Sequence, residues 1–218
     1  MPGARLRRSL EESDSGRFPP PSGPPATGGP SAGDRSWVAD FRLRSGATTL
    51  LEVARQCESL DKDEFVRLFP QPFLVQQTRN RATAKDARFV TLVGVDTGED
   101  RLDPLQAPVY YLTKKDRNGF QSMITIGRTE NNDVTLDSSR VSKFHAYFSE
   151  VAEAWYVTDS DSRNGSFLAG QPLVPRQATA LQNGIELAFS REVIFTFHDS
   201  ASMFDHLVTV RESPGYRA

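Results

Sequence analysis

The sequence predicts an all-β protein, an antiparallel β-sandwich that follows a short helical N-terminal extension and a disordered N-terminal tail. Between residues 88 and 210, short apolar runs alternate with polar positions at a period of two, which is typical of strands. Clusters of Asp, Asn, Ser and Gly separate these runs and predict turns. Many short strands without helices between them indicate a sandwich or a barrel.

The apolar runs that we expect to form strands are residues 89–95, 109–112, 123–126, 146–148, 155–157 and 193–197. Residues 202–207 are expected to form a short closing helix. We therefore assign residues 88–210 to the β-sandwich domain.

Residues 1–35 have a different composition. From residue 18 onward this segment consists almost entirely of Pro, Gly, Ser and other small residues. It has too little apolar surface to offset the entropy lost on ordering, so the sequence predicts a disordered Pro/Gly-rich tail that acts as a solvated spacer.

Residues 36–80 are predicted to form a short helical extension. Apolar residues recur at helical spacing on one face: Leu50, Ala54, Cys57 and Leu60. Thr48 or Thr49 is expected to cap the start of this helix, and Asp61 to cap a second one that ends before Pro70. Other apolar residues either dock this segment onto the following domain or form a partner surface: Phe65, Leu68, Phe69, Phe73 and Leu74.

Composition argues against several classes of function. A formal net charge of −2 disfavours broad nucleic-acid binding, which needs a basic field. The single cysteine, Cys57, excludes an intrachain disulfide and fits a reducing cytoplasm, where it is expected to be a small buried hydrophobe. We expect no secretory signal and no membrane span, since no apolar run is long enough.

The sequence also suggests no cofactor or metal. There is no Gly-rich nucleotide-binding loop, and His198 and His206 have no acidic or cysteine partners at metal-ligand spacing. His145 follows Ser142 by three residues, a spacing that does not orient a nucleophile and its base. We therefore expect no enzymatic activity. The acidic residues Glu130, Asp133 and Asp161 are expected to brace loops and turns.

Polar residues capable of binding a phosphate group gather in three predicted loops. The first contains Arg128, the second Ser142 and Lys143, and the third Arg163 and Asn164. A dianionic phosphate requires several converging cations and hydrogen-bond donors, which these side chains supply. The amide of an asparagine both donates and accepts, which suits the backbone of an extended peptide.

The order of these motifs resembles the signature of the forkhead-associated (FHA) domain. It runs Gly127-Arg128, then Asn-Asp-Val, then Val-Ser-Lys-Phe-His-Ala, then Ser-Arg-Asn-Gly-Ser-Phe. The resemblance covers residues 109–198, close to a full domain, and the form of the Ser-to-His motif is more similar to bacterial members. It implies a β-sandwich that recognises phosphothreonine peptides.

The resemblance also implies a role for each matching residue. Arg128 holds the peptide backbone and reaches toward the phosphate, Ser142 and Lys143 contact the phosphate, and Asn164 pins the peptide main chain. Three further residues are implied to support the site: Gly127, His145 and Gly165. Gly165 permits the turn that presents the asparagine.

The chain departs from the family pattern at a few positions. Arg163 stands where the family often has threonine, so we expect it either to attract the phosphate or to contact an acidic residue of the peptide. Ser166 replaces a threonine. Residues 169–170 and 184–185 differ from the family's usual turn sequences and put the geometry of those turns in doubt.

The implied partner is a phosphothreonine-containing protein, either a substrate of a Ser/Thr kinase or the kinase itself. Two alternatives remain open. The tail, phosphorylated at Ser9 or Thr27, folds back into the pocket as an autoinhibitor, or the protein acts as a phosphate-independent scaffold.

Overall fold

A computed structural model of the chain describes residues 38, 46, 48–77, 103–116, 118–120 and 122–216. The predicted tail, residues 1–35, and the predicted strand at residues 89–95 lie outside the described residues. No helix within the described ranges is both long and apolar enough to cross a membrane.

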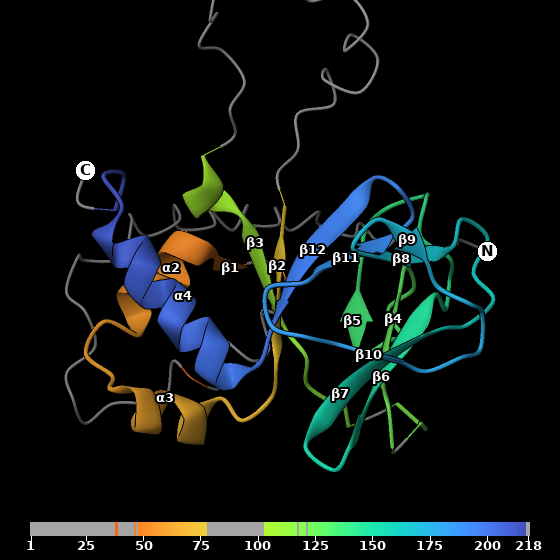
Figure 1. The fold of residues 1–218 in the computed structure, drawn as a ribbon, viewed down its shortest axis with the longest axis horizontal. Coiled ribbons are helices and arrows are strands. Elements are labelled where there is room, and N and C mark those ends of the chain that lie inside the picture. The colour runs from red at the N-terminus through yellow and green to blue at the C-terminus, as the bar shows by residue number, and fades with distance from the viewer. Residues whose placement is uncertain are drawn as a thin grey trace, which may run out of the picture.

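Two packed sheets form the body of the protein (Figure 1). In the described residues, the larger has seven strands in the order β1 (Thr48–Thr49), β3 (Pro108–Tyr111), β2 (Phe73–Gln76), β12 (Val193–His198), β11 (Glu186–Phe189), β8 (Ser166–Leu168) and β9 (Gln171–Pro172). The smaller has five, in the order β10 (Thr179–Ala180), β7 (Ala154–Asp159), β6 (Ala146–Val151), β4 (Ile124–Gly127) and β5 (Val134–Thr135). This architecture confirms the predicted β-sandwich. Within the described residues, β4 and β5 depart from the predicted antiparallel pairing, because these two strands run parallel.

The alternation along β6 shows why period two predicted these strands. Ala146 and Phe148 are fully buried, whereas Tyr147 and Ser149 between them are half-buried on the other face. Successive side chains of a strand point to opposite faces, so one face of β6 fills the sandwich core. That core is formed by residues of both sheets: Leu74, Leu112, Ile124, Ile126, Val134, Leu136, Val141, Ala146, Phe148, Val157, Leu187, Phe189, Val193, Phe195 and Phe197.

The end of the segment that was predicted to be helical forms a strand, β2, so the prediction was wrong for residues 73–76. Residues 73–76 pair with β12 on one side and β3 on the other, so they belong to the larger sheet. Phe73 and Val75 point into a second apolar cluster, and Leu74 points into the sandwich core. Because both faces of β2 are buried, the strand has no polar alternation, and its short apolar run is equally compatible with a helix.

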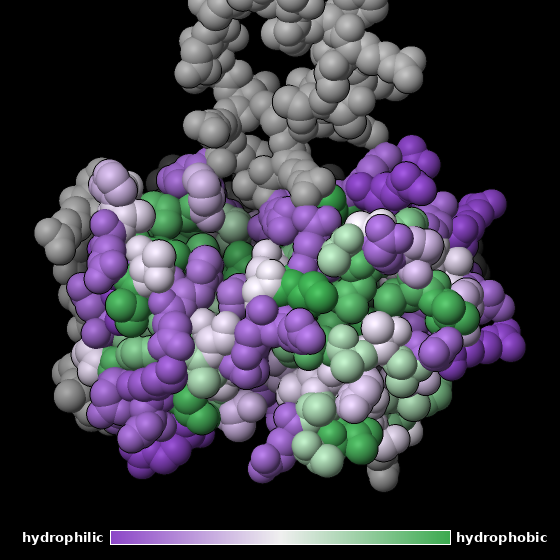
Figure 2. Space-filling model, viewed as in Figure 1, coloured by the Kyte–Doolittle hydropathy of each residue, from purple (hydrophilic) through white to green (hydrophobic). Residues whose placement is uncertain are grey.

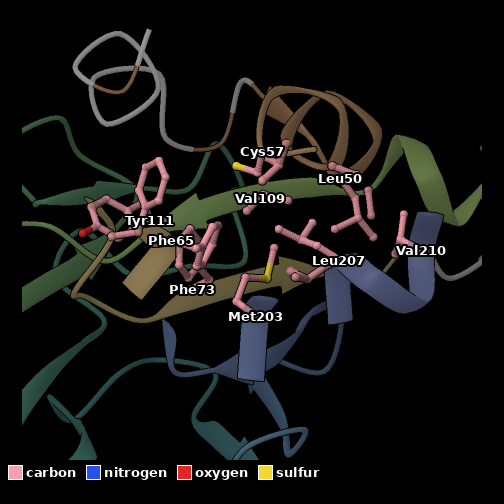
Figure 3. Packing of buried hydrophobic residues seen from close by; sticks show 14 of the residues in the cluster. Leu50, Cys57, Phe65, Phe73, Val109, Tyr111, Met203, Leu207 and Val210 are labelled. Atoms are coloured by element: carbon pink, nitrogen blue, oxygen red, sulfur yellow. The ribbon is translucent and has the colours of Figure 1, made fainter. Parts of the chain in front are cut away.

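The second cluster lies between the larger sheet and the helices α2 (Leu50–Gln56), α3 (Lys62–Leu68), η1 (Pro104–Gln106) and α4 (Ser200–Glu212). Side chains from α2, α3, α4, β2 and β3 converge in it (Figure 3). The ring of Phe73 lies 5.9 Å from that of Phe65 and 4.9 Å from that of Tyr111. Cys57 is buried in the same cluster, and burial raises the pKa of its thiol to about 12 despite the nearby charge of Arg211. Cys57 is thus an inert apolar residue.

The helix caps follow the sequence closely. The Thr49 hydroxyl accepts from the Glu52 amide, and the Glu52 carboxylate accepts from the Thr49 amide, which forms a capping box. The Asp61 carboxylate accepts from the Glu64 amide at 2.8 Å and starts α3. Both predicted caps are confirmed, with Thr49 rather than Thr48 in the first.

Helix α4 is longer than the predicted residues 202–207. Asp199 caps it, accepting from the Ser202 amide at 2.7 Å, and Met203, Leu207 and Val210 place one face in the helical cluster. In Figure 2 hydrophilic residues gather over α3 and α4, where the helices face the solvent. Packing of this apolar face, rather than local preference, sets the length of α4.

The division of the chain into residues 1–35, 36–80 and 88–210 stays a prediction, but the fold makes it testable. A fragment of residues 88–218 lacks β2, which separates β3 from β12, and also lacks α2 and α3. We expect no cooperative thermal unfolding for this fragment, because both apolar clusters lose their contacts with β2. The matched fragment 36–218 retains all described residues and is expected to unfold cooperatively. A dispersed NMR spectrum from fragment 88–218 would contradict this expectation.

Candidate functional site

The three loops with the predicted phosphate-binding residues meet at one edge of the smaller sheet. The register pairs Ile126 of β4 with Ala146 of β6, and Ala146 with Asp159 of β7. Antiparallel pairing therefore brings the end of β4, the start of β6 and the end of β7 to the same edge. Two more hydrogen bonds extend this ladder into the loops, since the His145 amide donates to the Ile126 carbonyl and the Ser160 amide to the His145 carbonyl, each at 2.9 Å.

Gly127 allows the first and second loops to approach closely. A Cβ atom at this position would collide with the carbonyl group of Lys143. That carbonyl accepts from the Asn132 side chain at 2.7 Å and from the Thr129 hydroxyl at 2.8 Å, while the Arg128 amide donates to the Ser142 carbonyl at 3.0 Å. The backbone beside the predicted phosphate donors is thus held at several points.

His145 joins the second loop to the third. Its ring is buried, its Nδ1 accepts from the Ser142 amide at 3.0 Å, and its Nε2 lies 3.3 Å from the Gly165 carbonyl. These partners require the neutral tautomer with hydrogen on Nε2. Burial lowers the pKa of His145, although the charge of Asp159 and the bond to Gly165 act in the opposite direction.

The Ser142 hydroxyl is positioned by the third loop. Its oxygen accepts a hydrogen bond from the Arg163 amide at 3.0 Å. A hydroxyl that accepts through a lone pair still has its own hydrogen to donate. Both nitrogens of His145 already have other partners, so Ser142 and His145 do not form a nucleophile and base pair.

Asn164 is exposed at the tip of the third loop, and its side-chain amide donates to the Arg140 carbonyl at 2.6 Å. No hydrogen bond within the described part of the chain uses its side-chain oxygen. Gly165, with a φ of 71°, makes the turn beside it, and the Gly165 carbonyl also accepts from the Ser190 amide at 2.9 Å. An L-residue with a side chain rarely adopts such a φ.

The same three loops carry three exposed cations: Arg128, Lys143 and Arg163. None of them forms a salt bridge with a described residue, so their charge is not neutralised by the protein there. Arg163 contributes its amide to Ser142 and leaves its guanidinium at the surface. The site can therefore attract an anion and offer it directed donors.

The sequence did not predict the role of Asp159 as the organiser of the third loop. The buried carboxylate accepts from the Ser162 amide and hydroxyl, at 2.8 and 2.7 Å, and from the Ser166 hydroxyl at 2.5 Å. Burial alone would raise its pKa, but these hydrogen bonds and the nearby His145 outweigh burial, and the pKa is lowered. An aspartate three residues before a serine, at the end of a strand, is the signal for such a turn.

Other acidic residues brace loops as predicted. Asp133 accepts from the amides of Thr125 and Lys115 and from the ammonium group of Lys114, each at 2.8 Å. Asp161, with a φ of 63°, pairs with Arg176 at 2.8 Å. Within the described residues, no group of three or more His, Cys, Asp or Glu side chains is placed to hold a metal ion.

The turns at residues 169–170 and 184–185, whose sequences differ from the family pattern, have regular geometry. Ala169 and Gly170 join β8 to β9 with φ angles of 47° and 76°, and positive φ at both positions is what a tight hairpin requires. Gly184 also has a positive φ, 77°. The departures from the family pattern thus do not disrupt these turns.

We predict that the imidazole of His145 titrates below its ordinary pKa of 6.5, because the ring is buried and because protonation would also direct an N–H of the ring at the Ser142 amide. The unfolded chain takes up this proton and the folded chain resists it, so the contribution of His145 to stability is present above pH 6.5 and falls as the pH drops below it. An NMR titration of the three histidine side chains measures this pKa, and a His145→Asn variant assigns the signal. A pKa above 6.5 would contradict the neutral bridge.

Comparison with known proteins gives a family for this region. Residues 124–190, which span all three loops, match the family model of the FHA domain. No curated protein matches the chain.

Several solved structures are similar. EmbR of Mycobacterium tuberculosis, in complex with a low-affinity phosphopeptide, is 29% identical over 36% of this chain with a TM-score of 0.33; the match spans only 20% of the EmbR chain. The N-terminal FHA domain of Rad53p from S. cerevisiae, in complex with a phosphothreonine peptide, is 21% identical over 43% of this chain and 86% of its own, with a TM-score of 0.36. The FHA domain of CT664 from Chlamydia trachomatis is 14% identical over 59% of this chain and 97% of its own, with a TM-score of 0.39.

The match of the family model covers the strands β4 to β11 and the three loops of the candidate site. Residues 124–190, which contain the candidate site, are therefore similar to an FHA domain.

Proposed function

We propose that this protein recognises phosphothreonine in partner proteins and thereby mediates phosphorylation-dependent contacts in Ser/Thr kinase signalling. The observation that carries the proposal is the hydrogen bond from the Arg163 amide to the Ser142 oxygen. It fixes the hydroxyl on loops that carry three exposed cations, and it leaves the hydrogen of the hydroxyl for a phosphate oxygen.

In this proposal Arg128, Lys143 and Arg163 attract the phosphate, and Ser142 donates to it. Asn164 holds the peptide main chain through its side-chain oxygen, which accepts from a peptide amide. The bond from Asn164 to the Arg140 carbonyl orients this oxygen before a peptide arrives. Gly127, His145 and Gly165 maintain the loops and do not touch the ligand.

A preference for phosphothreonine over phosphoserine requires that the threonine methyl group influence how the phosphate sits. One buried methyl group contributes only about 0.8 kcal/mol. A stronger preference therefore depends on the methyl group also setting the angle at which the phosphate meets Ser142. A cytoplasmic location and a bacterial kinase pathway, both expected from the sequence, belong to the same proposal.

We predict that Arg128→Ala abolishes measurable binding of phosphothreonine peptides, since it removes a charge-assisted contact of about 2–5 kcal/mol. Arg67→Ala is the matched control, because Arg67 is an exposed arginine on α3 and its loss changes the net charge equally. Calorimetry with a degenerate phosphothreonine library measures the affinity, and circular dichroism checks the fold. Wild-type affinity in Arg128→Ala would refute this assignment.

The same library in phosphoserine and unphosphorylated forms tests the ligand class. We expect tight binding of the phosphothreonine set, weaker binding of the phosphoserine set and none of the unphosphorylated set. Equal binding of all three sets would favour the phosphate-independent scaffold.

A further inference from the structure

A groove with a volume of about 560 Å³ lies where α4, η1 and the start of α2 meet the outer face of the larger sheet. Ligand pockets typically measure roughly 300–1,000 Å³, so the groove has room for several side chains. Leu50 and Val210 lie at this end of the helical cluster (Figure 3). The apolar part of the groove is lined by Leu50, Val75, Pro104, Leu105, Ala107 and Val210.

Several polar side chains of the groove already have partners within the protein. The Gln77 side-chain amide donates to the Thr196 hydroxyl at 3.3 Å, and the Thr209 hydroxyl donates to the Asp205 carbonyl at 3.2 Å. His206 also lines the groove, and burial lowers the pKa of its ring below the ordinary 6.5, so the ring is neutral at pH 7. Burying polar groups that find no partner is costly, so the groove suits an occupant whose contacts are mainly apolar.

The chain itself meets the groove at both ends of one stretch. Gln77 is the last described residue before residues 78–102, Asp103 is the first one after them, and both line the groove. These 25 residues contain one run that is rich in large apolar residues, residues 89–95. An extended chain covers about 3.3 Å per residue, so the links on the two sides of this run can extend to about 40 and 26 Å. Both links are therefore long enough for the run to return to the groove.

The strands on either side of this stretch already have a neighbour along each edge. In the larger sheet β2 lies between β3 and β12, and β3 lies between β1 and β2. A strand at residues 89–95, as the sequence predicts, therefore cannot pair beside β2 or β3, and its apolar side chains need other cover. The groove over β2 offers such cover at the point where the stretch begins and ends.

We infer that the groove binds residues 89–95 of the same chain through their large apolar side chains. This inference is independent of phosphothreonine recognition, because the groove lies on the larger sheet and the candidate site at the end of the smaller one. A segment joined to its site by a short link has an effective concentration in the millimolar range, which a separate partner must exceed. A stable interface with a second copy buries roughly 1,200 Å² or more, whereas the groove is sized for a few side chains.

Thiol labelling of the full chain tests the inference, because Cys57 is the only cysteine and its buried thiol, with a pKa of about 12, is unreactive. Leu92→Cys and Val93→Cys each place one reactive thiol in the run, and adjacent side chains of an extended segment point to opposite faces. Thr97→Cys places a matched thiol just outside the run. We expect the thiol at position 92 or 93 to react with a maleimide roughly tenfold or more slowly than the thiol at position 97.

A variant that fills the groove separates binding there from any other cause of protection. Thr209 is an exposed residue of α4 that lines the groove, so Thr209→Trp should bring the slow thiol to the rate of the thiol at position 97. Val208→Trp is the matched control, because Val208 is the exposed neighbour on the same helix and is not among the described residues that line the groove. It should leave the slow rate unchanged, and circular dichroism checks that both variants are folded.

The other outcomes overturn the inference and assign the groove differently. Fast labelling at both positions 92 and 93, or slow labelling that Thr209→Trp retains, shows that the run does not occupy the groove. Protection that is lost on dilution, together with dimers in light scattering, assigns the groove to a second copy. Fast labelling combined with binding of the apolar dye anilinonaphthalene sulfonate, which Thr209→Trp abolishes, assigns it to an external apolar ligand. None of these outcomes affects the proposed function, which the peptide library tests separately.

Discussion

The candidate site depends on the hydrogen bonds of one buried imidazole. His145 accepts from the amide of Ser142 and donates to the carbonyl of Gly165, so a single ring fixes the distance between two loops that are distant in sequence. Its ring also lies edge-on against Phe189 of the larger sheet, with ring centroids 5.5 Å apart. The loops are thus tied to each other and to the sandwich core, and only the neutral ring can do both.

Around His145 hydrogen bonds hold the backbone of the loops in place, whereas the charged side chains are exposed. The Ser142 hydroxyl and the Asn164 amide have protein partners that orient them, whereas Arg128, Lys143 and Arg163 extend to the solvent. Ordering a long side chain on binding costs about 0.5–1.5 kcal/mol. The fixed groups therefore define the geometry of a ligand, and the cations contribute attraction that adapts to it.

Buried and half-buried residues alternate along β6, whereas β4 and β12 are buried almost throughout and were predicted from short apolar runs between turn clusters. The run of β2 is equally apolar, but it follows a helical pattern directly and was therefore assigned to the helical segment. Strands of two residues, such as β5 and β10, are too short to show any period.

The site residues were placed by the order of their motifs, because each motif ends or begins a strand whose register brings the loops together. The role of Asp159 was missed, since a buried carboxylate in a turn looks like a surface residue until its three donors are in place. Sequence order thus predicted the residues that we propose to face the ligand, whereas the residues that position them required tertiary contacts.

The helical cluster lies against the larger sheet, whereas the candidate site lies at the end of the smaller sheet. None of the proposed ligand residues is part of the cluster among the described residues. The cluster instead covers the outer face of β2 and β3, which would otherwise leave Phe73 and Tyr111 in water. Helix α4 is anchored where it leaves β12, because Asp199 both caps it and bonds to Asn183 in the turn before β11. Substitutions in the cluster should therefore change stability, while ligand choice stays with the loops at the opposite sheet.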